Sequence, residues 1–229
     1  MAVGKREHGR RSRLLLLGLL LSLTACASGS QPRLPYRAWC VGLLAPNYME
    51  VWIESVDVID RRGLVFEQVH AGVAAIQTPP NNSGNPHGWP QRVGGEKGKN
   101  LPGIDLPEIV FVRWQSLVEP QTYNVRINIP AWVREAMETK VSPKFPWASD
   151  WGKEVLTGYR YMLTIGLAPG GIAKVWLQGP CLEPLEVGRF EGAISKLGPY
   201  DGLSGGKHRP LSEGSRGYVE THGVPYGSW

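Results

Sequence analysis

Alternation of apolar and polar residues constrains the fold of this chain more than any other feature. Residues 122–129, TYNVRINI, place four apolar side chains on one face and four polar side chains on the other. Residues 159–167 repeat the pattern, and residues 168–171, APGG, supply turn chemistry before an apolar return over 172–177. Successive side chains of a β-strand point to opposite faces, so these segments predict half-buried antiparallel strands, the last two joined as a hairpin.

Further strands are expected over residues 36–44, 48–60, 64–76 and 108–117. Within 48–60 the apolar phase changes by one residue, as it does at a β-bulge. Pro130 suits the first position of a helix over 131–139, and Ser212 could cap a second short helix that ends near Gly223. We therefore predict a mostly β chain: an antiparallel β-sandwich with one or two short peripheral helices.

The beginning of the chain follows a different pattern. Five basic residues precede a short apolar run, LLLLGLLLSL, at residues 14–23. An α-helix needs about 20 apolar residues to cross a bilayer, so this run is too short to span one. Basic residues, a short apolar run and small residues after it predict a secretory signal peptide over residues 1–25. Residues 23–26, LTAC, resemble a bacterial lipobox, in which cleavage precedes the cysteine and lipid is attached to it.

We therefore expect lipid chains such as palmitate on Cys26, a tether over residues 26–34 and a single β-rich domain over residues 35–229. The alternative is an ordinary signal peptide with an incidental cysteine. Ala27, rather than an acidic residue, follows Cys26, which favours an outer-membrane lipoprotein facing the periplasm over retention at the inner membrane. The membrane is thus one expected partner, reached through the lipid anchor.

The charge of the chain changes once the signal peptide is set aside. The whole chain has 25 Lys+Arg and 20 Asp+Glu, but residues 1–25 hold five of the basic residues and one of the acidic ones. The mature chain therefore carries a net charge of only +1. A nucleic-acid-binding surface is usually strongly basic, so we expect no nucleic-acid partner.

Two cysteines remain after Cys26. Disulfides persist in an oxidising compartment such as the periplasm, so we expect Cys40 and Cys181 to be bonded to each other. The alternative is two separate buried thiols.

Motifs for catalysis are weak. Residues 202–206, GLSGG, match G-x-S-x-G, and His208 follows closely, but a hydrolase elbow needs a strand before the serine and a helix after it. We expect loop on both sides. The carboxylates of the 48–60 strand are expected to face solvent: Glu50, Glu54 and Asp57. The histidines lack the close spacing of metal ligands. We therefore expect no enzyme, no catalytic residue, no metal site and no cofactor.

Aromatic residues in loops are better candidates for binding, because tryptophan is enriched in protein interfaces. The candidates for partner binding are Trp89, Trp147, Trp151, Tyr226 and Trp229. The alternative is that such residues pack in the core, which we expect of Trp114 and Trp176.

Four segments resemble a family of Gram-negative lipoproteins that is catalogued only as a domain of unknown function. The segments are YMEVWIES at 48–55, RWQSLVEPQTY at 113–123, GLAPGGIAKVW at 166–176 and HGVPYGSW at 222–229. The resemblance covers about residues 35–229, includes Cys40 and Cys181, and brings no established catalytic residue.

Genes of this family often lie beside those of type VI secretion effectors of the phospholipase type. The resemblance thus implies a periplasmic immunity protein that binds and inhibits such an effector. On this reading we expect a loop at 78–105 or 143–151 to occlude the substrate entrance of the effector. The alternative is a non-enzymatic lipoprotein for envelope maintenance or ligand binding.

Overall fold

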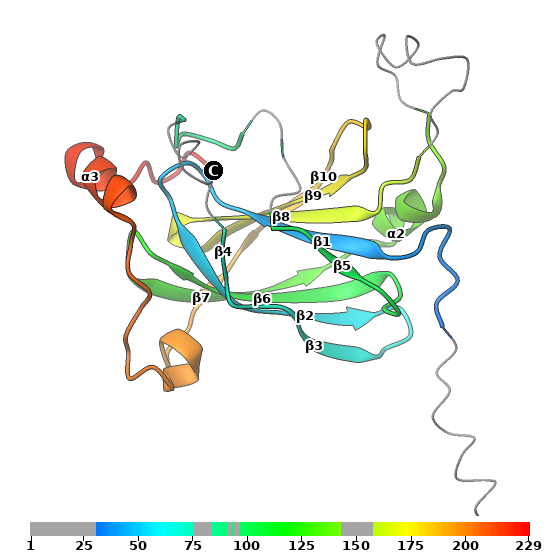
Figure 1. Ribbon diagram of the computed structural model, residues 1–229, viewed down its shortest axis with the longest axis horizontal. Helices are drawn as coiled ribbons and strands as arrows, with labels where there is room; N and C mark the ends of the chain where they lie inside the picture. The colour runs from blue at the N-terminus through cyan, green and yellow to red at the C-terminus, as the bar shows by residue number, and fades with distance from the viewer. Residues whose placement is uncertain (1–30, 76–83, 91–92, 94–96, 143–157) are drawn as a thin grey trace, which may run out of the picture. The chain divides into compact units, whose positions relative to one another are not determined.

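Two β-sheets pack face to face (Figure 1). The computed structural model describes residues 31–75, 84–90, 93, 97–142 and 158–229. The first sheet has the order β10 (Leu185–Glu191), β9 (Ile172–Gln178), β8 (Met162–Ala168), β1 (Trp39–Leu44) and β5 (Lys99–Leu101). The second sheet has the order β11 (Ala193–Ile194), β7 (Gln121–Asn128), β6 (Pro107–Ser116), β2 (Val51–Asp60) and β3 (Val65–His70). A short strand, β4 (Val73–Ala75), also pairs with β2. The predicted β-sandwich is confirmed.

One pair of strands departs from the predicted antiparallel pattern. β1 and β8 run parallel, with Val41 opposite Leu163 and Leu43 opposite Ile165. Parallel neighbours cannot be joined by a tight turn and need a long crossover. Here the crossover contains most of the second sheet. After β1 the chain forms β2, β3 and β4, returns to the first sheet for the short edge strand β5 beside β1, forms β6 and β7, and rejoins the first sheet at β8.

The core lies between the sheets and is formed by the inward-facing positions of the alternating strands. Tyr123, Val125 and Ile127 on β7 are all buried, as their spacing predicted. They meet residues of the first sheet such as Ile165, which is fully buried. A buried aliphatic side chain contributes about 1.5–3 kcal/mol to folding, so this apolar layer is the main source of stability.

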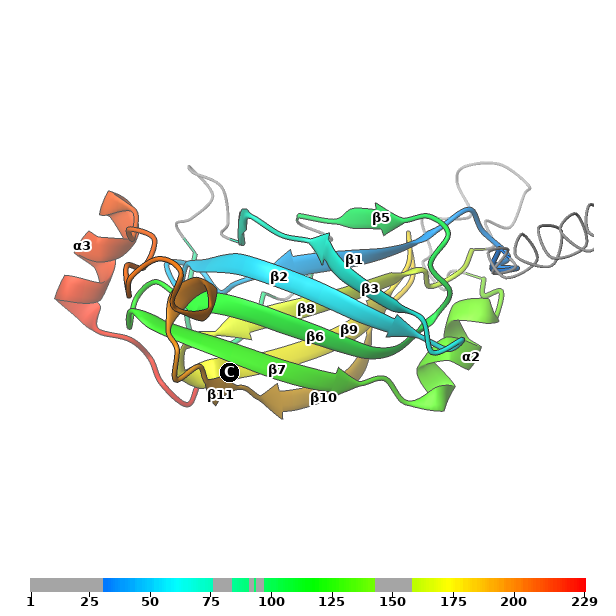
Figure 2. The same cartoon turned by 90° about the horizontal axis from the view of Figure 1, so that it is seen from below.

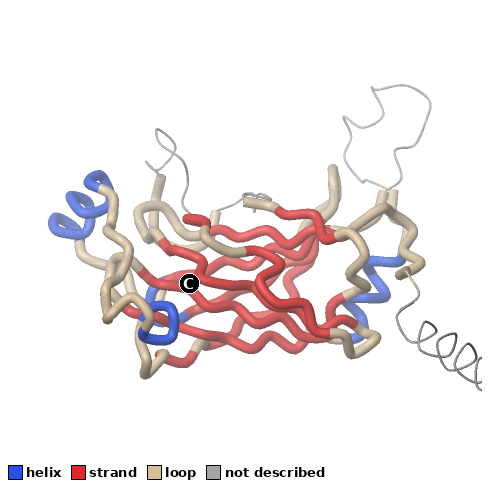
Figure 3. The backbone as a smooth tube through the Cα atoms, turned by 60° about the horizontal axis from the view of Figure 1, so that its bottom comes forward, coloured by secondary structure: helices blue, strands red, loops and turns tan. Residues whose placement is uncertain are grey.

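The predicted irregularity in β2 is also present, because its register with β6 shifts between Ile53 and Ser55. Both predicted helices form. α2 (Ala131–Glu138) follows Pro130 and buries Val133 and Met137. α3 (Glu213–His222) is capped by the Ser212 side chain and ends at Gly223. The two helices lie at opposite ends of the sheets (Figures 1 and 3).

The expected disulfide is not formed: Cys40 and Cys181 are both free thiols, one buried and one exposed. The topology explains why. β8 lies between β1, which carries Cys40, and β9, which leads to Cys181 beyond its end at Gln178. Bridged cysteines sit no more than about 7 Å apart between their Cα atoms, and here β8 separates β1 from the strand that leads to Cys181. Burial raises the pKa of the Cys40 thiol, which keeps it protonated.

The hairpin between β8 and β9 turns at Pro169–Gly171, where Gly170 and Gly171 both have φ of +76°. Only glycine adopts this left-handed region without strain. A Cβ on Gly171 would lie 2.8 Å from the Tyr123 ring and 2.9 Å from the Gly192 carbonyl oxygen, whereas at Gly170 the nearest atom is 3.7 Å away.

These two glycines offer a matched pair of variants. Gly170→Ala should lower the free energy of unfolding by about 1 kcal/mol through backbone strain alone. Gly171→Ala should cost about 1–3 kcal/mol more, because its methyl group meets backbone that cannot move aside. Urea unfolding of the two variants measures the difference. Equal losses would contradict the close approach of the hairpin to β7.

Candidate functional site

A long segment after β11 crosses the outer face of the second sheet. We call residues 195–215 the arm. The arm begins where Ser195 donates its N–H to the Thr122 carbonyl on β7, at 2.8 Å. It then passes over β6 toward β2 and enters α3, as the orange segment in front of β2, β6 and β7 shows (Figure 2). The side chains under the arm are therefore the outward-facing ones of these three strands.

Glu54 on β2 is the main anchor of the arm. Its side chain is only 2% exposed and pairs with Arg113 on β6, with 2.6 Å between Oε2 and Nε. The backbone N–H of Tyr200 in the arm donates to both carboxylate oxygens, at 2.9 and 3.0 Å. Gln115 on β6 donates its side-chain amide to Oε1 at 2.8 Å. A buried carboxylate needs such partners, and here the arm itself supplies one of them.

Arg113 on β6 connects the same network to residues at the start of the arm. It donates to the Ser195 hydroxyl at 2.9 Å and to the Gly198 carbonyl at 2.8 Å. It also pairs with Asp201 at 2.7 Å. A single guanidinium thus ties Glu54 on β2 to three separate points of the arm.

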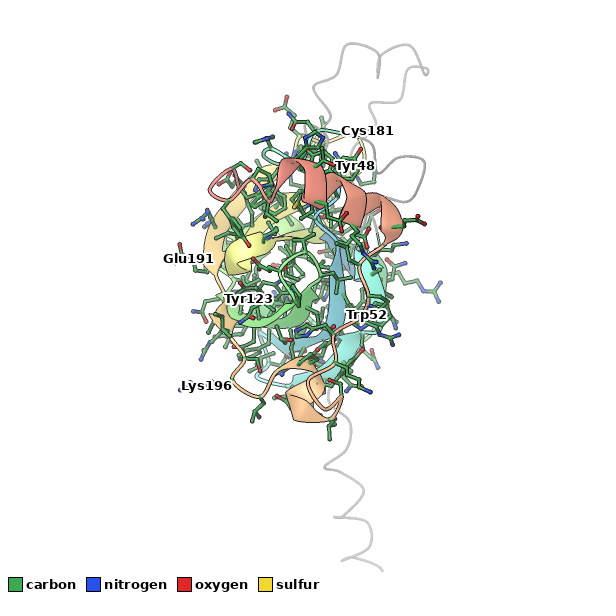
Figure 4. The ribbon with its side chains drawn as sticks, turned by 90° about the vertical axis from the view of Figure 1, so that its left-hand side faces the viewer. Tyr48, Trp52, Tyr123, Cys181, Glu191 and Lys196 are labelled. Carbon is green, nitrogen blue, oxygen red and sulfur yellow. The ribbon has the colours of Figure 1, made fainter. Side chains whose placement is uncertain are left out.

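Trp52 and Gln115 hold the next part of the arm. Trp52, seen beside the orange segment in Figure 4, donates its indole N–H to the Tyr200 hydroxyl at 2.6 Å. The Arg209 guanidinium stacks over the Trp52 ring, 4.2 Å from its centroid. The backbone N–H of Arg209 donates to the Gln115 side-chain oxygen at 2.7 Å. These contacts fix the arm on both sides of its turn.

The far end of the arm rests on Glu50, just before β2. This carboxylate accepts the backbone N–H of Ser212 at 3.1 Å and the hydroxyl groups of Ser212 and Ser215. Ser212 is also the cap of α3. Glu50 therefore positions the start of the helix.

The expectation that Glu50 and Glu54 face solvent is wrong: they are 4% and 7% exposed. Both do lie on the outward side of β2, as the alternation of the strand requires, but the arm covers that side. Asp57 is half-buried and accepts the Gln68 N–H at 2.7 Å. Nothing local in the β2 sequence indicates the covering segment, which comes from about 150 residues later.

Ser204 and His208 lie on the arm but are engaged separately. The Ser204 hydroxyl donates to the Pro199 carbonyl at 3.3 Å, while His208 Nε2 lies 3.3 Å from the Thr122 hydroxyl oxygen on β7. Loop follows the G-x-S-x-G motif, as predicted, but a short 3-10 helix, η4 (Pro199–Gly202), rather than loop precedes Ser204. The geometry is therefore not that of a hydrolase elbow, in which the serine projects between a strand and a helix.

Two of the aromatic candidates for partner binding pack against an apolar cluster, Trp229 buried and Trp89 half-buried. Trp229 is 8% exposed and lies in a small apolar cluster with Met49 and Ala168, and its indole donates to the Pro86 carbonyl at 2.9 Å. Trp89 packs against the same cluster and meets Trp176 edge-on at 5.3 Å. These two residues pin the 84–90 segment and the 224–229 segment to the ends of β8 and β9.

The other candidates divide in two groups. Tyr226 is 59% exposed and donates its hydroxyl to Glu119 at 2.7 Å. Partial burial and this hydrogen bond raise the pKa of Tyr226 to about 12. Trp147, Trp151 and the proposed lipidation residue Cys26 lie outside the described residues, as does the 143–151 loop. The 78–105 segment is described in part, and it contains β5.

A cavity of 560 Å³ lies at the start of β1, away from the arm. Its lining is Tyr36, Arg37, Ala38, Asn100, Pro102 and Tyr161. The Tyr36 ring lies 5.7 Å from the rings of both Tyr159 and Tyr161. The lining combines aromatic rings, one guanidinium and one amide, and includes no carboxylate.

A protein-family comparison matches residues 26–227 to the family described as "Protein of unknown function (DUF2931)". The chain belongs to this family. Comparisons with curated proteins and with solved structures gave no match. Within the described residues, no helix is long and apolar enough to cross a membrane, and no three potential metal ligands come together.

The Glu54 network gives a direct test of how the arm is held. Glu54→Gln removes the buried carboxylate from the half-buried Arg113, which keeps only the exposed Asp201 as an acidic partner, and should lower the free energy of unfolding by about 3 kcal/mol. Cleavage between residues 196 and 209 under limited proteolysis should also become faster. Glu186→Gln is the matched control, since the Glu186 side chain is 55% exposed and pairs with Lys174 at the surface. That change should cost less than about 1 kcal/mol. Equal effects of the two variants would contradict the anchoring role of Glu54.

Proposed function

We propose that this chain is a lipid-anchored periplasmic immunity protein that binds and inhibits a phospholipase effector of type VI secretion. In this proposal, the signal peptide and the acylated Cys26 hold the domain at the outer membrane, whose lipids the effector attacks. The domain itself acts by binding, with no cofactor and no nucleic-acid partner.

The arm is the observation that carries this proposal. Glu50, Glu54 and Arg113 are buried or half-buried charged groups at the outer face of the second sheet, and all three hold the arm in place. These three charged groups are thus engaged in positioning an exposed segment. A pre-positioned segment is a good inhibitor element, because little conformational entropy is lost when it docks.

A second candidate, a ligand-binding lipoprotein of the envelope, is favoured by the cavity beside Tyr36. Aromatic rings with an arginine and an amide suit a ligand that carries both a flat or sugar-like body and a negative charge. Fragments of peptidoglycan have this chemistry.

The immunity proposal predicts stoichiometric inhibition. The full chain, purified in detergent, should abolish the activity of one phospholipase effector of its own organism on phospholipid micelles at a ratio near one to one. Cells that produce this effector in the periplasm should survive when they also make the chain. The Cys26→Ser variant should still inhibit in the micelle assay but protect cells less well. Unchanged activity of every effector at a large excess of the chain would refute the proposal.

The ligand-binding candidate predicts a different result. A disaccharide muropeptide, titrated calorimetrically into the full chain, should bind, and Arg37→Ala or Tyr161→Ala should weaken binding about tenfold or more. Arg160→Ala is the control, because Arg160 contacts the Glu183 carbonyl outside the cavity lining. The absence of heat with the unaltered chain would rule out this ligand.

A further inference from the structure

Three aliphatic residues at the beginning of the arm, within ten positions of the chain, are exposed to solvent. Ile194 is 56% exposed, Leu197 64% and Leu203 90%. Leu197 and Leu203 belong to neighbouring turns, because a Cβ on Gly202 would lie 3.3 Å from the Leu197 carbonyl oxygen. Apolar side chains exposed together, rather than singly, are typical of interaction sites. We call residues 196–207 the tip of the arm.

The tip is held rigidly by its own hydrogen bonds as well as by Glu54. The N–H of Leu203 donates to the Tyr200 carbonyl at 3.0 Å, and the N–H of Gly205 donates to the Gly202 carbonyl at 2.9 Å. Tyr200 and Asp201 adopt left-handed φ values of 50° and 53°. Such backbone is costly for residues with a side chain and persists where the surroundings enforce it. The tip therefore presents Leu203 in one defined position.

Charge around the tip is unbalanced. Lys196 and Lys207, which precede and follow Leu203 in the chain, are both exposed, and Figure 4 shows Lys196 at the periphery of the arm. No ion pair involves either lysine among the described residues. The one acidic residue of the tip, Asp201, is already paired with Arg113. The unpaired charges of the tip are thus positive, and they precede and follow Leu203 in the chain.

From these observations we infer that the tip is the inhibitory contact, and that Leu203 inserts into an apolar cleft with an acidic rim on the partner protein. This inference rests on the proposed function and deepens it. In a lipid-cleaving enzyme, the apolar cleft that would receive Leu203 is the entrance through which the acyl chains of the substrate reach the active site. A tip with an aliphatic centre and a cationic border matches that entrance in both polarity and charge.

Rigidity favours a protein partner over a membrane. An anionic bilayer would also attract two lysines and accept leucine side chains. A fluid bilayer, however, adapts to any loop shape, so it gains nothing from a turn fixed by a buried carboxylate. A cleft of fixed shape gains affinity from such pre-positioning.

Leu203→Asp is the decisive variant, because a 90%-exposed side chain can be changed without disturbing the core. It should weaken inhibition of the effector by about 30-fold or more, the effect of losing a central interface anchor. Val65→Asp is the matched control: Val65 is also apolar and 62% exposed, but it lies on the edge strand β3. It should inhibit as the unaltered chain does. Circular dichroism should show the same thermal transition for Leu203→Asp as for the unaltered chain.

A charge variant tests the rim independently. Lys196→Glu combined with Lys207→Glu should slow association with the effector and remove its dependence on salt, because rim charges act mainly on the rate of encounter. Lys140→Glu, an exposed lysine after α2, should leave the rate of association unchanged.

The outcomes separate the tip inference from the proposed function. If the unaltered chain inhibits the effector and Leu203→Asp inhibits equally well, the tip inference is wrong and the immunity function stands. If the unaltered chain inhibits no effector, both are overturned. A third outcome concerns the Cys26→Ser variant, which lacks the lipid anchor. If this variant binds phosphatidylglycerol vesicles and the added change Leu203→Asp abolishes that binding, the tip contacts a membrane and the inferred protein partner is overturned.

Discussion

The burial of Glu54 is the constraint on which the rest of the outer surface depends. A carboxylate removed from water must be compensated by charge and hydrogen bonds, and no single strand can supply enough of them. β6 supplies Arg113 and Gln115, and the arm supplies the N–H of Tyr200. The arm is therefore not an appendage to a finished sandwich, since it both removes Glu54 from water and supplies part of the hydrogen bonding that replaces that water.

The path of the chain makes this arrangement possible. The first sheet is begun by β1 and β5 and completed only by β8, β9 and β10, after every strand of the second sheet except β11 has been formed. β11 then pairs with β7, at the edge of the second sheet opposite β3. The arm therefore starts at the β7 edge of the second sheet, from which it can run across β7, β6 and β2. Local turn chemistry and the order of strands together determine where the arm starts.

Local patterns predicted most of the fold because each depends on neighbouring residues. Alternation identified the inward face of β7, the phase change identified the irregularity in β2, and Ser212 and Gly223 marked the limits of α3. The parallel pairing of β1 with β8, and the separation of Cys40 from Cys181, depend on strand order, which alternation does not encode. The burial of Glu54 and Trp229 was missed for a related reason. Outward-facing and terminal residues look the same in sequence whether or not a distant segment covers them.

A buried ion pair such as Glu54–Arg113 is a poor source of net stability, because desolvation of both groups offsets most of their attraction. The ion pair instead contributes directional contacts. An apolar contact would tolerate many positions of the arm. A carboxylate that accepts the N–H of Tyr200 and a guanidinium that pairs with Asp201 tolerate few. The same pair holds Tyr200 and Asp201 in left-handed backbone that they would not adopt alone. The interaction therefore fixes the position of Leu203 more than it strengthens the fold. That is the property an inhibitory contact needs and a purely structural loop does not.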